Sequence, residues 1–170
     1  MEENGKYNEE CKEYKEEQNM GVKMPPIEKV HEAYGAISDN RIVLRENEAD
    51  VSSSDLSKTY LVTWKDKVYT SNDNASYWQG YASYPIIAVL MLQGKLSLNR
   101  EIVGRFQGVD WKKRNTEHKN KNAEAVDEIM EELKKSGVDT EEINKEIQKV
   151  YKELEGLDIS TKRSRLRPPK

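Results

Sequence analysis

Any fold of this chain has to accommodate the stretch from Lys58 to Gly94, where large apolar and aromatic residues are concentrated in a recognisable order. Residues 60–64 alternate Tyr, Val and Trp with other side chains, and this period of two is typical of a strand with one buried face. Residues 65–67 form a polar turn, and residues 68–70 begin a second strand. The sequence therefore predicts a β-hairpin at the centre of the fold.

A buried helix is predicted after this hairpin. Residues 71–74, Ser-Asn-Asp-Asn, interrupt the second strand, because Asn and Asp bond their own backbone and tolerate left-handed conformations. Pro85 then precedes the apolar run 86–92 and Gly94 follows it, which is the usual punctuation at the start and the end of a helix. A helix that is apolar on all sides is stable only when other elements cover nearly all of it. The sheet cannot be its only cover, so other helices are expected to pack around it.

The rest of the chain is predicted from the spacing of its apolar residues. The expected elements are a leading helix at 26–38, strands at 41–45 and 49–52, a helix around 102–106, a helix that starts near Trp111, and an antiparallel helical hairpin over 123–155. Residues 112–122 contain no large apolar side chain and are compatible with either a long exposed helix or a linker. The predicted fold class is α+β: a small antiparallel sheet of about four strands packed with a leading helix and a buried helix, followed by a C-terminal helical extension with a hairpin.

Charge is distributed unevenly along the chain and suggests four regions. Charged residues make up 35% of the sequence and the net charge is −3, which is polar for a compact domain of this length. We therefore predict a charged, disordered tail at 1–24, an α+β core at 25–108, a helical extension at 109–158 and a basic tail at 159–170. In the first tail, Tyr7, Cys11 and Tyr14 have helical spacing, so a transient amphipathic helix is an alternative there.

The cysteine content and the hydropathy pattern indicate the compartment. Cys11 is the single cysteine, so no disulfide can form within the chain, which is compatible with a reducing cytosol. No apolar run approaches the ~18–20 residues of a membrane span, and the N-terminal residues are too charged for a signal peptide. The expected location is cytoplasmic, without membrane contact.

Residues 27–94 resemble the SWIM family of small zinc-binding modules in the order of their elements. Tyr60-Leu61-Val62 matches the Y-x-V run of that family's core strand, and Ile86-Ile87-Ala88-Val89-Leu90 is similar to its apolar helix. The resemblance implies an α+β module with a role in nucleic-acid binding. The zinc ligands themselves are replaced: Ser71-Asn72-Asp73 stands where the family has Cys-x-Cys, and Ser83-Tyr84-Pro85 where it has Cys-x-His. A structural zinc site requires four nitrogen or sulfur ligands, so no metal and no other cofactor is expected.

Four aromatic residues between the second strand and the buried helix are the candidate protein-binding residues. They are Tyr77, Trp78, Tyr81 and Tyr84. Two interpretations stay open, because such rings can either cover the buried helix in place of the missing metal or form a surface that binds a peptide or another ligand. In the first interpretation Trp78 is a core residue, and its truncation to Ala would cost ~3–5 kcal/mol of stability.

Two basic segments are the candidates for contact with nucleic acid. The first holds Lys112, Lys113, Arg114, Lys119 and Lys121, and the second is the terminal run at 162–170. Lys and Arg side chains neutralise backbone phosphates, so either segment could bind a duplex. Residues 119–158 carry twelve acids against seven bases, however, and would repel the same polyanion. A solubilising helix and a disordered tail are the alternative interpretation of the two segments.

No set of acid, base and nucleophile can be assembled from the sequence. Residues 52–55 contain serines without a neighbouring base, residues 72–74 lack the spaced acids of a calcium loop, and His31 is expected at the surface or in a helix cap. We therefore expect a non-catalytic interaction module that binds a protein partner of unknown identity. A nucleic-acid-binding accessory protein that uses residues 112–121 and 162–170 is the alternative, and the oligomeric state stays open.

Overall fold

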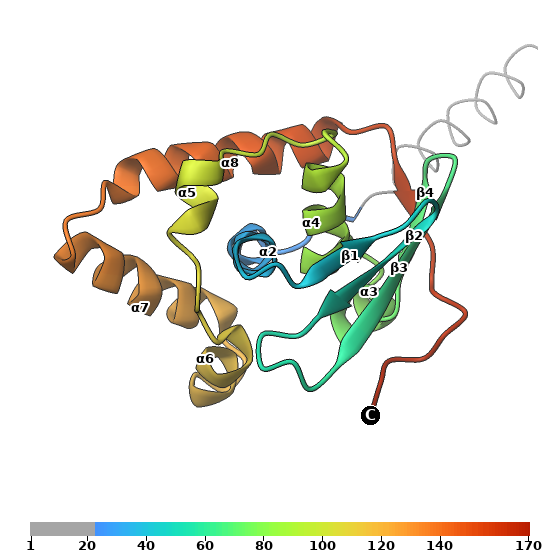
Figure 1. The fold of residues 1–170 in the computed structure, drawn as a ribbon, viewed down its shortest axis with the longest axis horizontal. Coiled ribbons are helices and arrows are strands. Elements are labelled where there is room, and N and C mark those ends of the chain that lie inside the picture. The colour runs from blue at the N-terminus through green and yellow to red at the C-terminus, as the bar shows by residue number, and fades with distance from the viewer. Residues whose placement is uncertain (1–22) are drawn as a thin grey trace, which may run out of the picture.

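The computed structural model describes residues 23–170, so Cys11 and nearly all of the tail predicted at 1–24 lie outside the described residues (Figure 1). The predicted α+β class is confirmed, because a leading helix is followed by a mostly antiparallel sheet and by C-terminal helices. The helices are α2 (Glu28–Ser38), α3 (Asn74–Gln79), α4 (Tyr84–Leu92), α5 (Arg100–Gly104), α6 (Trp111–Glu117), α7 (Asn122–Lys135) and α8 (Thr140–Gly156). The strands are β1 (Ile42–Leu44), β2 (Glu48–Ser52), β3 (Thr59–Lys65), β4 (Val68–Ser71) and β5 (Ser160–Thr161).

The sheet has five strands in the order β1-β2-β3-β4-β5, one more than predicted. The strands from β1 to β4 form the expected antiparallel meander, whereas β5 pairs in parallel with β4 through Val68–Ser160 and Tyr69–Thr161. The fifth strand was not predicted, because two polar residues carry no alternation of apolar side chains. The segment interpreted as a basic tail therefore begins on the edge of the sheet.

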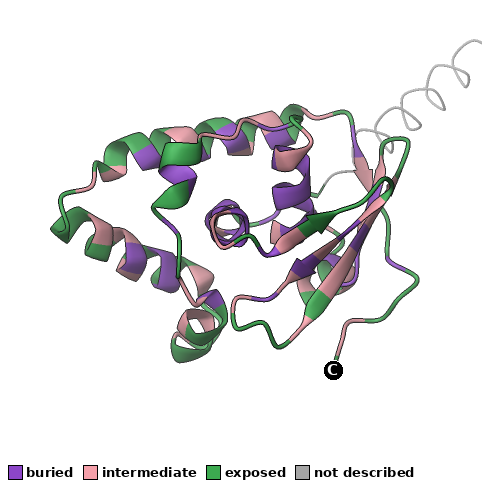
Figure 2. Ribbon diagram, in the orientation of Figure 1, coloured by how far each residue is buried: buried purple, intermediate pink, exposed green. Residues whose placement is uncertain are grey.

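The buried helix predicted from the sequence is α4, and it lies in the centre of the core. Every residue from Pro85 to Met91 is buried. The strands β3 and β4 lie against this helix, and α2 packs against it as well (Figure 1). Figure 2 shows that buried residues are concentrated on α2 and α4. The expectation that other helices complete the cover of α4 is confirmed by its contact with α2.

The leading helix α2 is buried on more sides than its amphipathic sequence predicts. It packs against α4, α5, α7 and α8, and Figure 1 shows it nearly end-on in the middle of the molecule. All residues from 29 to 37 are buried, including the polar Lys29, His31 and Glu32. His31, expected at the surface or in a cap, packs edge-on against Phe106 with ring centroids 5.9 Å apart. That expectation is wrong because distant helices cover the face of α2 that the local pattern assigns to solvent.

The C-terminal helices settle the conformation of residues 112–122. The helix α6 ends at Glu117, and Lys119 and Asn120 then adopt left-handed backbone conformations with φ of 54° and 64°. This segment is therefore a short helix followed by a tight turn, rather than one long helix or a linker. The predicted helices α7 and α8 follow and contact each other, and Asp139 caps α8 by accepting hydrogen bonds from the backbone of its first turn.

Membrane insertion by a helix finds no support in the part of the chain that the structure describes. None of the helices formed by residues 23–170 combines the length and the apolar character that crossing a bilayer requires.

The first prediction concerns Gly35, where α2 approaches the indole of Trp111. A Cβ at this position would lie 2.4 Å from Trp111 Nε1, which is too close for a buried, rigid ring. Replacing Gly by Ala in a helix usually gains up to about 1 kcal/mol, but overpacking a core costs about 1–3 kcal/mol. We expect Gly35→Ala to be less stable than the parent in urea unfolding. The matched control is Gly104→Ala in α5, where nothing lies within 4 Å of the added Cβ, and it should be neutral or stabilising. A Gly35→Ala protein as stable as the parent would contradict the packing described here.

The second prediction uses the buried imidazole of His31. Burial lowers the pKa of His31 from 6.5 to about 4. Between these two values the unfolded chain binds a proton that the folded chain does not, so this stabilisation is present above pH 6.5 and is lost as the pH falls towards 4. The loss amounts to about 3 kcal/mol at most, at about 1.4 kcal/mol per pKa unit.

Urea unfolding at pH 7 and pH 5 measures this effect as a difference between variants. His31→Leu should lose less stability than the parent over this interval, because its side chain does not titrate. His118→Gln removes a half-buried ring whose pKa is raised by its hydrogen bond to Glu128 and which therefore gains stability on acidification, so this variant should show an acid-induced loss at least as large as the parent's. Equal losses in the parent and in His31→Leu would show that His31 is not the group concerned.

Candidate functional site

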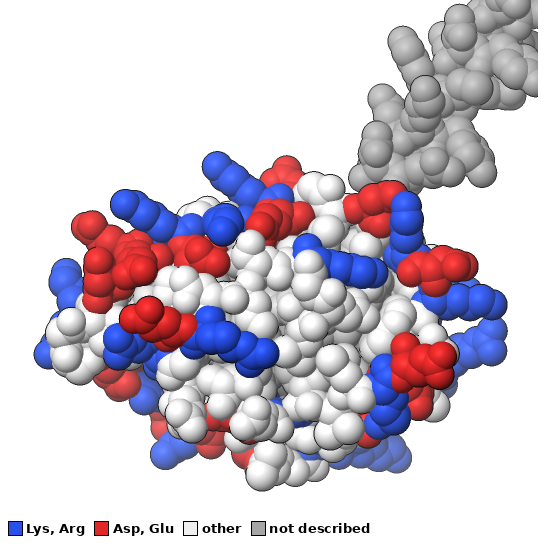
Figure 3. Space-filling view, turned by 45° about the horizontal axis from the view of Figure 1, so that its top comes forward, with Lys and Arg blue, Asp and Glu red and all other residues white. Residues whose placement is uncertain are grey.

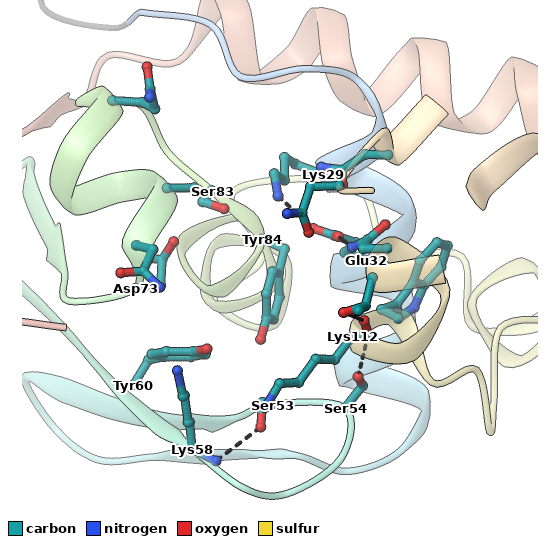
Figure 4. A pocket seen from close by; sticks show the side chains of 18 of the residues that line it. Lys29, Glu32, Ser53, Ser54, Lys58, Tyr60, Asp73, Ser83, Tyr84 and Lys112 are labelled. Atoms are coloured by element: carbon teal, nitrogen blue, oxygen red, sulfur yellow. Dashed lines mark hydrogen bonds and ion pairs between the residues drawn. The ribbon is translucent and has the colours of Figure 1, made fainter. Parts of the chain in front are cut away.

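A polar cavity of about 670 Å³ lies between α2, the sheet, α3 and α6 (Figure 4). Its lining combines residues that are far apart in the sequence, from Lys29 to Asn122. Four cationic side chains and two anionic ones line it, which gives a formal charge of +2. The cations are Lys29, Arg41, Lys58 and Lys112, and the anions are Glu32 and Asp73.

One wall of the cavity is a buried ion pair on α2. Lys29 and Glu32 lie one helical turn apart, and Lys29 Nζ donates to Glu32 Oε2 at 3.0 Å. The other carboxylate oxygen of Glu32 accepts a hydrogen bond of 2.7 Å from Asn115 Nδ2 on α6. Burial pulls the pKa of Lys29 down, but the Glu32 carboxylate outweighs it and the pKa is raised overall. Lys29 therefore stays charged, and both Glu32 oxygens are occupied.

Arg41 forms the floor between α2 and the sheet. The chain leaves α2 through Asn40, whose φ of 53° turns the backbone, and Arg41 follows as a buried residue. Arg41 Nη1 donates to the backbone oxygen of Ser52 at 2.7 Å, and Arg41 Nε lies 3.7 Å from an Asp39 carboxylate oxygen. Only part of the donor capacity of this guanidinium is used, since Nε has no hydrogen-bond partner among residues 23–170.

Two tyrosines from different elements meet in the cavity. Tyr60 projects from β3 and Tyr84 from the first turn of α4, with ring centroids 6.5 Å apart and planes at 82°. Burial raises the pKa of Tyr84, with Tyr60 adding to the rise and Arg41 opposing it. Burial also raises the pKa of Tyr60 and of Tyr81, which lines the same cavity. At neutral pH all three phenols stay protonated and can donate hydrogen bonds.

The short helix α3 closes the side of the cavity where the sequence predicts a loop. Asp73 caps this helix, because its Oδ2 accepts from Ser76 N at 3.0 Å while its Oδ1 accepts from Ser71 Oγ. Gly80 ends the helix in a left-handed conformation with φ of 75°. The carboxylate of Asp73 is therefore engaged in holding α3 in place.

Several buried polar atoms of the lining have no hydrogen-bond partner among the described residues. They are Ser83 Oγ, Trp111 Nε1, Asn115 Oδ1 and Arg41 Nε. A buried donor or acceptor that is left unpaired costs about 1–3 kcal/mol, so such groups need an explanation. Four of the six such atoms among the described residues belong to residues that line this cavity, which makes it the candidate functional site.

The structure brings three of the four candidate protein-binding residues to this cavity. Trp78, Tyr81 and Tyr84 line it, whereas Tyr77 does not. The expectation that Trp78 is a core residue is wrong, because its side chain is 63% exposed. The reason is that residues 74–79 form a helix rather than a loop folded over α4, and this helix buries Ser76 and directs Trp78 outwards.

The five basic candidates for nucleic-acid contact do not form a free positive patch. Arg114 Nη1 lies 2.7 Å from Glu128 and 2.9 Å from Glu132, and Lys112 Nζ lies 3.0 Å from Asp55. Lys121 is 3.7 Å from Glu124, while Lys113 and Lys119 are exposed. On the face drawn in Figure 3, basic and acidic side chains are likewise interspersed. Within this group Lys112 is the one residue that lines the cavity.

Metal ligation has no support within residues 23–170, where no cluster of three or more His, Cys, Asp or Glu side chains is placed to hold an ion. Three of the four positions aligned with the SWIM ligands have other roles here. Ser71 donates to Asp73, and Ser83 lies in the cavity wall.

Most charged residues of the cavity were missed from the sequence. Lys29, Glu32, Arg41 and Lys58 look like ordinary solvated side chains, and the partner of Glu32 on α6 is 83 positions away. One local signal was present: Lys29 and Glu32 adjoin the apolar stripe of α2 at a spacing that allows them to pair. That spacing alone does not distinguish a buried pair from an exposed one.

Comparison with protein families gives one match. A family model described as uncharacterised conserved protein UCP014422 matches residues 22–160, which include all elements of the cavity. No curated protein and no solved structure matches the chain. The family match carries no link to SWIM modules, so that resemblance stays a prediction.

The third prediction concerns Trp78, for which the sequence predicted a large loss of stability on truncation to Ala. Because the indole is mostly exposed, Trp78→Ala should change the free energy of unfolding by less than about 1 kcal/mol. Trp111→Ala is the comparison, since this indole is buried and its truncation should cost about 3–5 kcal/mol. Thermal and urea unfolding of both variants measures the difference. Similar losses of stability in the two variants would show that Trp78 is packed in the core.

Proposed function

We propose that this chain, which belongs to the family of uncharacterised conserved proteins UCP014422, is a non-catalytic binding protein whose polar cavity takes a small ligand rich in hydrogen-bond acceptors. The observation that carries the proposal is the excess of charged and polar donors around one half-open cavity. Lys29, Arg41 and three phenols line it, and the formal charge of the lining is +2. Such a lining favours a ligand with negative charge.

Binding rather than acid–base catalysis is supported by the protonation states. Catalytic acids and bases usually have pKa values moved towards the working pH. Each resolved shift among the lining residues runs the other way, since the pKa values of Lys29, Tyr60, Tyr81 and Tyr84 are all raised. These groups hold their protons at neutral pH and act as fixed donors.

Binding of a protein partner is a second candidate, supported by the exposed ring of Trp78 at the edge of the cavity. Its indole meets Tyr77 edge-on at 4.8 Å, and the guanidinium of Arg163 lies 5.8 Å from its centroid. Exposed Trp, Tyr and Arg side chains are common anchors in protein interfaces. With a single cysteine in the sequence, a cytoplasmic location is proposed for either function.

The fourth prediction tests the cavity by filling it. Ala75 on α3 lines the space, so Ala75→Trp should obstruct a ligand without removing any polar group. Thermal unfolding is measured against a panel of nucleotides, sugar phosphates, dicarboxylates and amino acids, since a bound ligand raises the melting temperature. We expect at least one anionic compound to stabilise the parent but not the variant.

The matched control is Ala123→Trp, which makes the same change at an exposed position of α7 and should respond like the parent. Stabilisation of Ala75→Trp equal to that of the parent would place the ligand elsewhere. A panel with no stabilising compound, together with a protein partner whose binding depends on Trp78, would favour the second candidate.

A further inference from the structure

We propose that Arg41, Lys58, Tyr60 and Tyr84 form an oxyanion subsite inside the cavity, which holds a phosphate or carboxylate group of the ligand. This inference rests on the proposed function and adds the chemical class of the group that is recognised. The four side chains come from three places in the chain: the turn after α2, the strand β3 with the residue before it, and the start of α4. The fold alone brings them together.

The donors of this subsite point into one space. In Figure 4 the hydroxyl ends of Tyr60 and Tyr84 and the amine of Lys58 are directed towards the same open part of the cavity. The edge-to-face arrangement of the two rings, with centroids 6.5 Å apart, fixes the directions of the two hydroxyls. Arg41 belongs to the lining of the same cavity.

Three of these donors, the Lys58 ammonium and the two phenol hydroxyls, have no hydrogen-bond partner within residues 23–170, whereas Arg41 donates to Ser52 O and lies 3.7 Å from an Asp39 carboxylate oxygen. The backbone N–H of Lys58 donates to Ser53 Oγ at 3.1 Å, which anchors the residue. Its ammonium makes no hydrogen bond or ion pair within residues 23–170. The nearby carboxylates have other partners, since Glu32 is held by Lys29 and Asn115 while Asp73 caps α3. The Lys58 ammonium, the two neutral phenols and the unused N–H groups of Arg41 thus remain for an external anion.

Oxyanions suit this donor set better than other ligands do. A phosphate or carboxylate accepts several hydrogen bonds at once, and bonds to a charged partner are about twice as strong as neutral ones. Arg supplies a planar fork and Lys a compact charge, and both bind either anion. The phenols remain donors because burial raises the pKa of each, so they accommodate an anion without carrying negative charge themselves.

The experiment uses the full chain with inorganic phosphate and acetate as separate probes. Each sodium salt is titrated at constant ionic strength against sodium chloride, and the melting temperature is followed as a function of anion concentration. We expect a saturable rise with at least one of the two anions. The variants Lys58→Gln and Tyr84→Phe should weaken its apparent affinity about ten-fold or more, because each removes a donor to a charged group.

Matched controls make the same chemical changes outside the cavity. Lys65→Gln alters an exposed lysine at the far end of β3, and Tyr77→Phe removes the hydroxyl of a neighbouring aromatic that does not line the space. Both should bind the anion as the parent does. A response confined to phosphate identifies a phosphorylated ligand, and one confined to acetate identifies a carboxylate.

The experiments can refute the oxyanion subsite and the ligand-binding role of the cavity independently of each other. The inference is overturned if neither anion raises the melting temperature above the chloride control, or if Lys58→Gln and Tyr84→Phe bind as tightly as the parent. If a panel compound is still excluded by Ala75→Trp in that case, the cavity binds a ligand through other residues. If an anion binds the parent but binds weakly to Lys58→Gln and Tyr84→Phe, the subsite is supported. This holds even if Ala75→Trp binds every panel compound as the parent does.

Discussion

The need to bury α4 organises the rest of the structure. A helix with no polar face is stable only when it is surrounded, and here every residue from Pro85 to Met91 is buried. The strands β3 and β4 supply one part of that cover, and α2 supplies another. The helix α2 is itself covered by α5, α7 and α8. The helical extension is therefore not an independent appendage, because it completes the cover of a helix that itself covers α4.

This layered burial also explains why charged residues lie inside the molecule. The helix α2 carries Lys29 and Glu32 on the side that α6 approaches, and a charge is buried at tolerable cost only when it is paired and hydrogen-bonded. The ion pair between Lys29 and Glu32 meets this requirement, because Glu32 also accepts a hydrogen bond from Asn115. Ser83 and Trp111, by contrast, retain buried polar atoms without partners among residues 23–170, and both residues belong to the lining of the same cavity. The buried charges of α2 are thus paired, whereas several other polar atoms of the cavity-lining residues are not.

Local patterns were enough to predict the class of the fold and most of its elements. The alternation at Tyr60, Val62 and Trp64 identified β3, and the Pro85–Gly94 frame identified α4. The site was not predictable in the same way, since its residues acquire their roles through partners far along the chain. Lys58 resembles any surface lysine until the fold places it in the lining of the same cavity as Tyr84. The aromatic residues were recognised from composition, but α3 was missed because its cap at Asp73 was interpreted as part of a turn.

The wall formed by α3 shows how two distant segments support the cavity. A helix of six residues is unstable alone, because nucleation is costly and most of its backbone groups lack helical partners. Three donors satisfy carbonyl oxygens at its C-terminal end: Lys23 Nζ bonds Gln79 at 3.1 Å, Thr161 Oγ1 bonds Gly80 at 3.0 Å, and Arg163 Nε bonds Tyr77 at 3.2 Å. The strand β5 holds Thr161 in register with β4, and Arg163 follows two residues later. The C-terminal segment therefore belongs to the architecture of the cavity, because it fixes the wall to which Trp78 and Tyr81 belong.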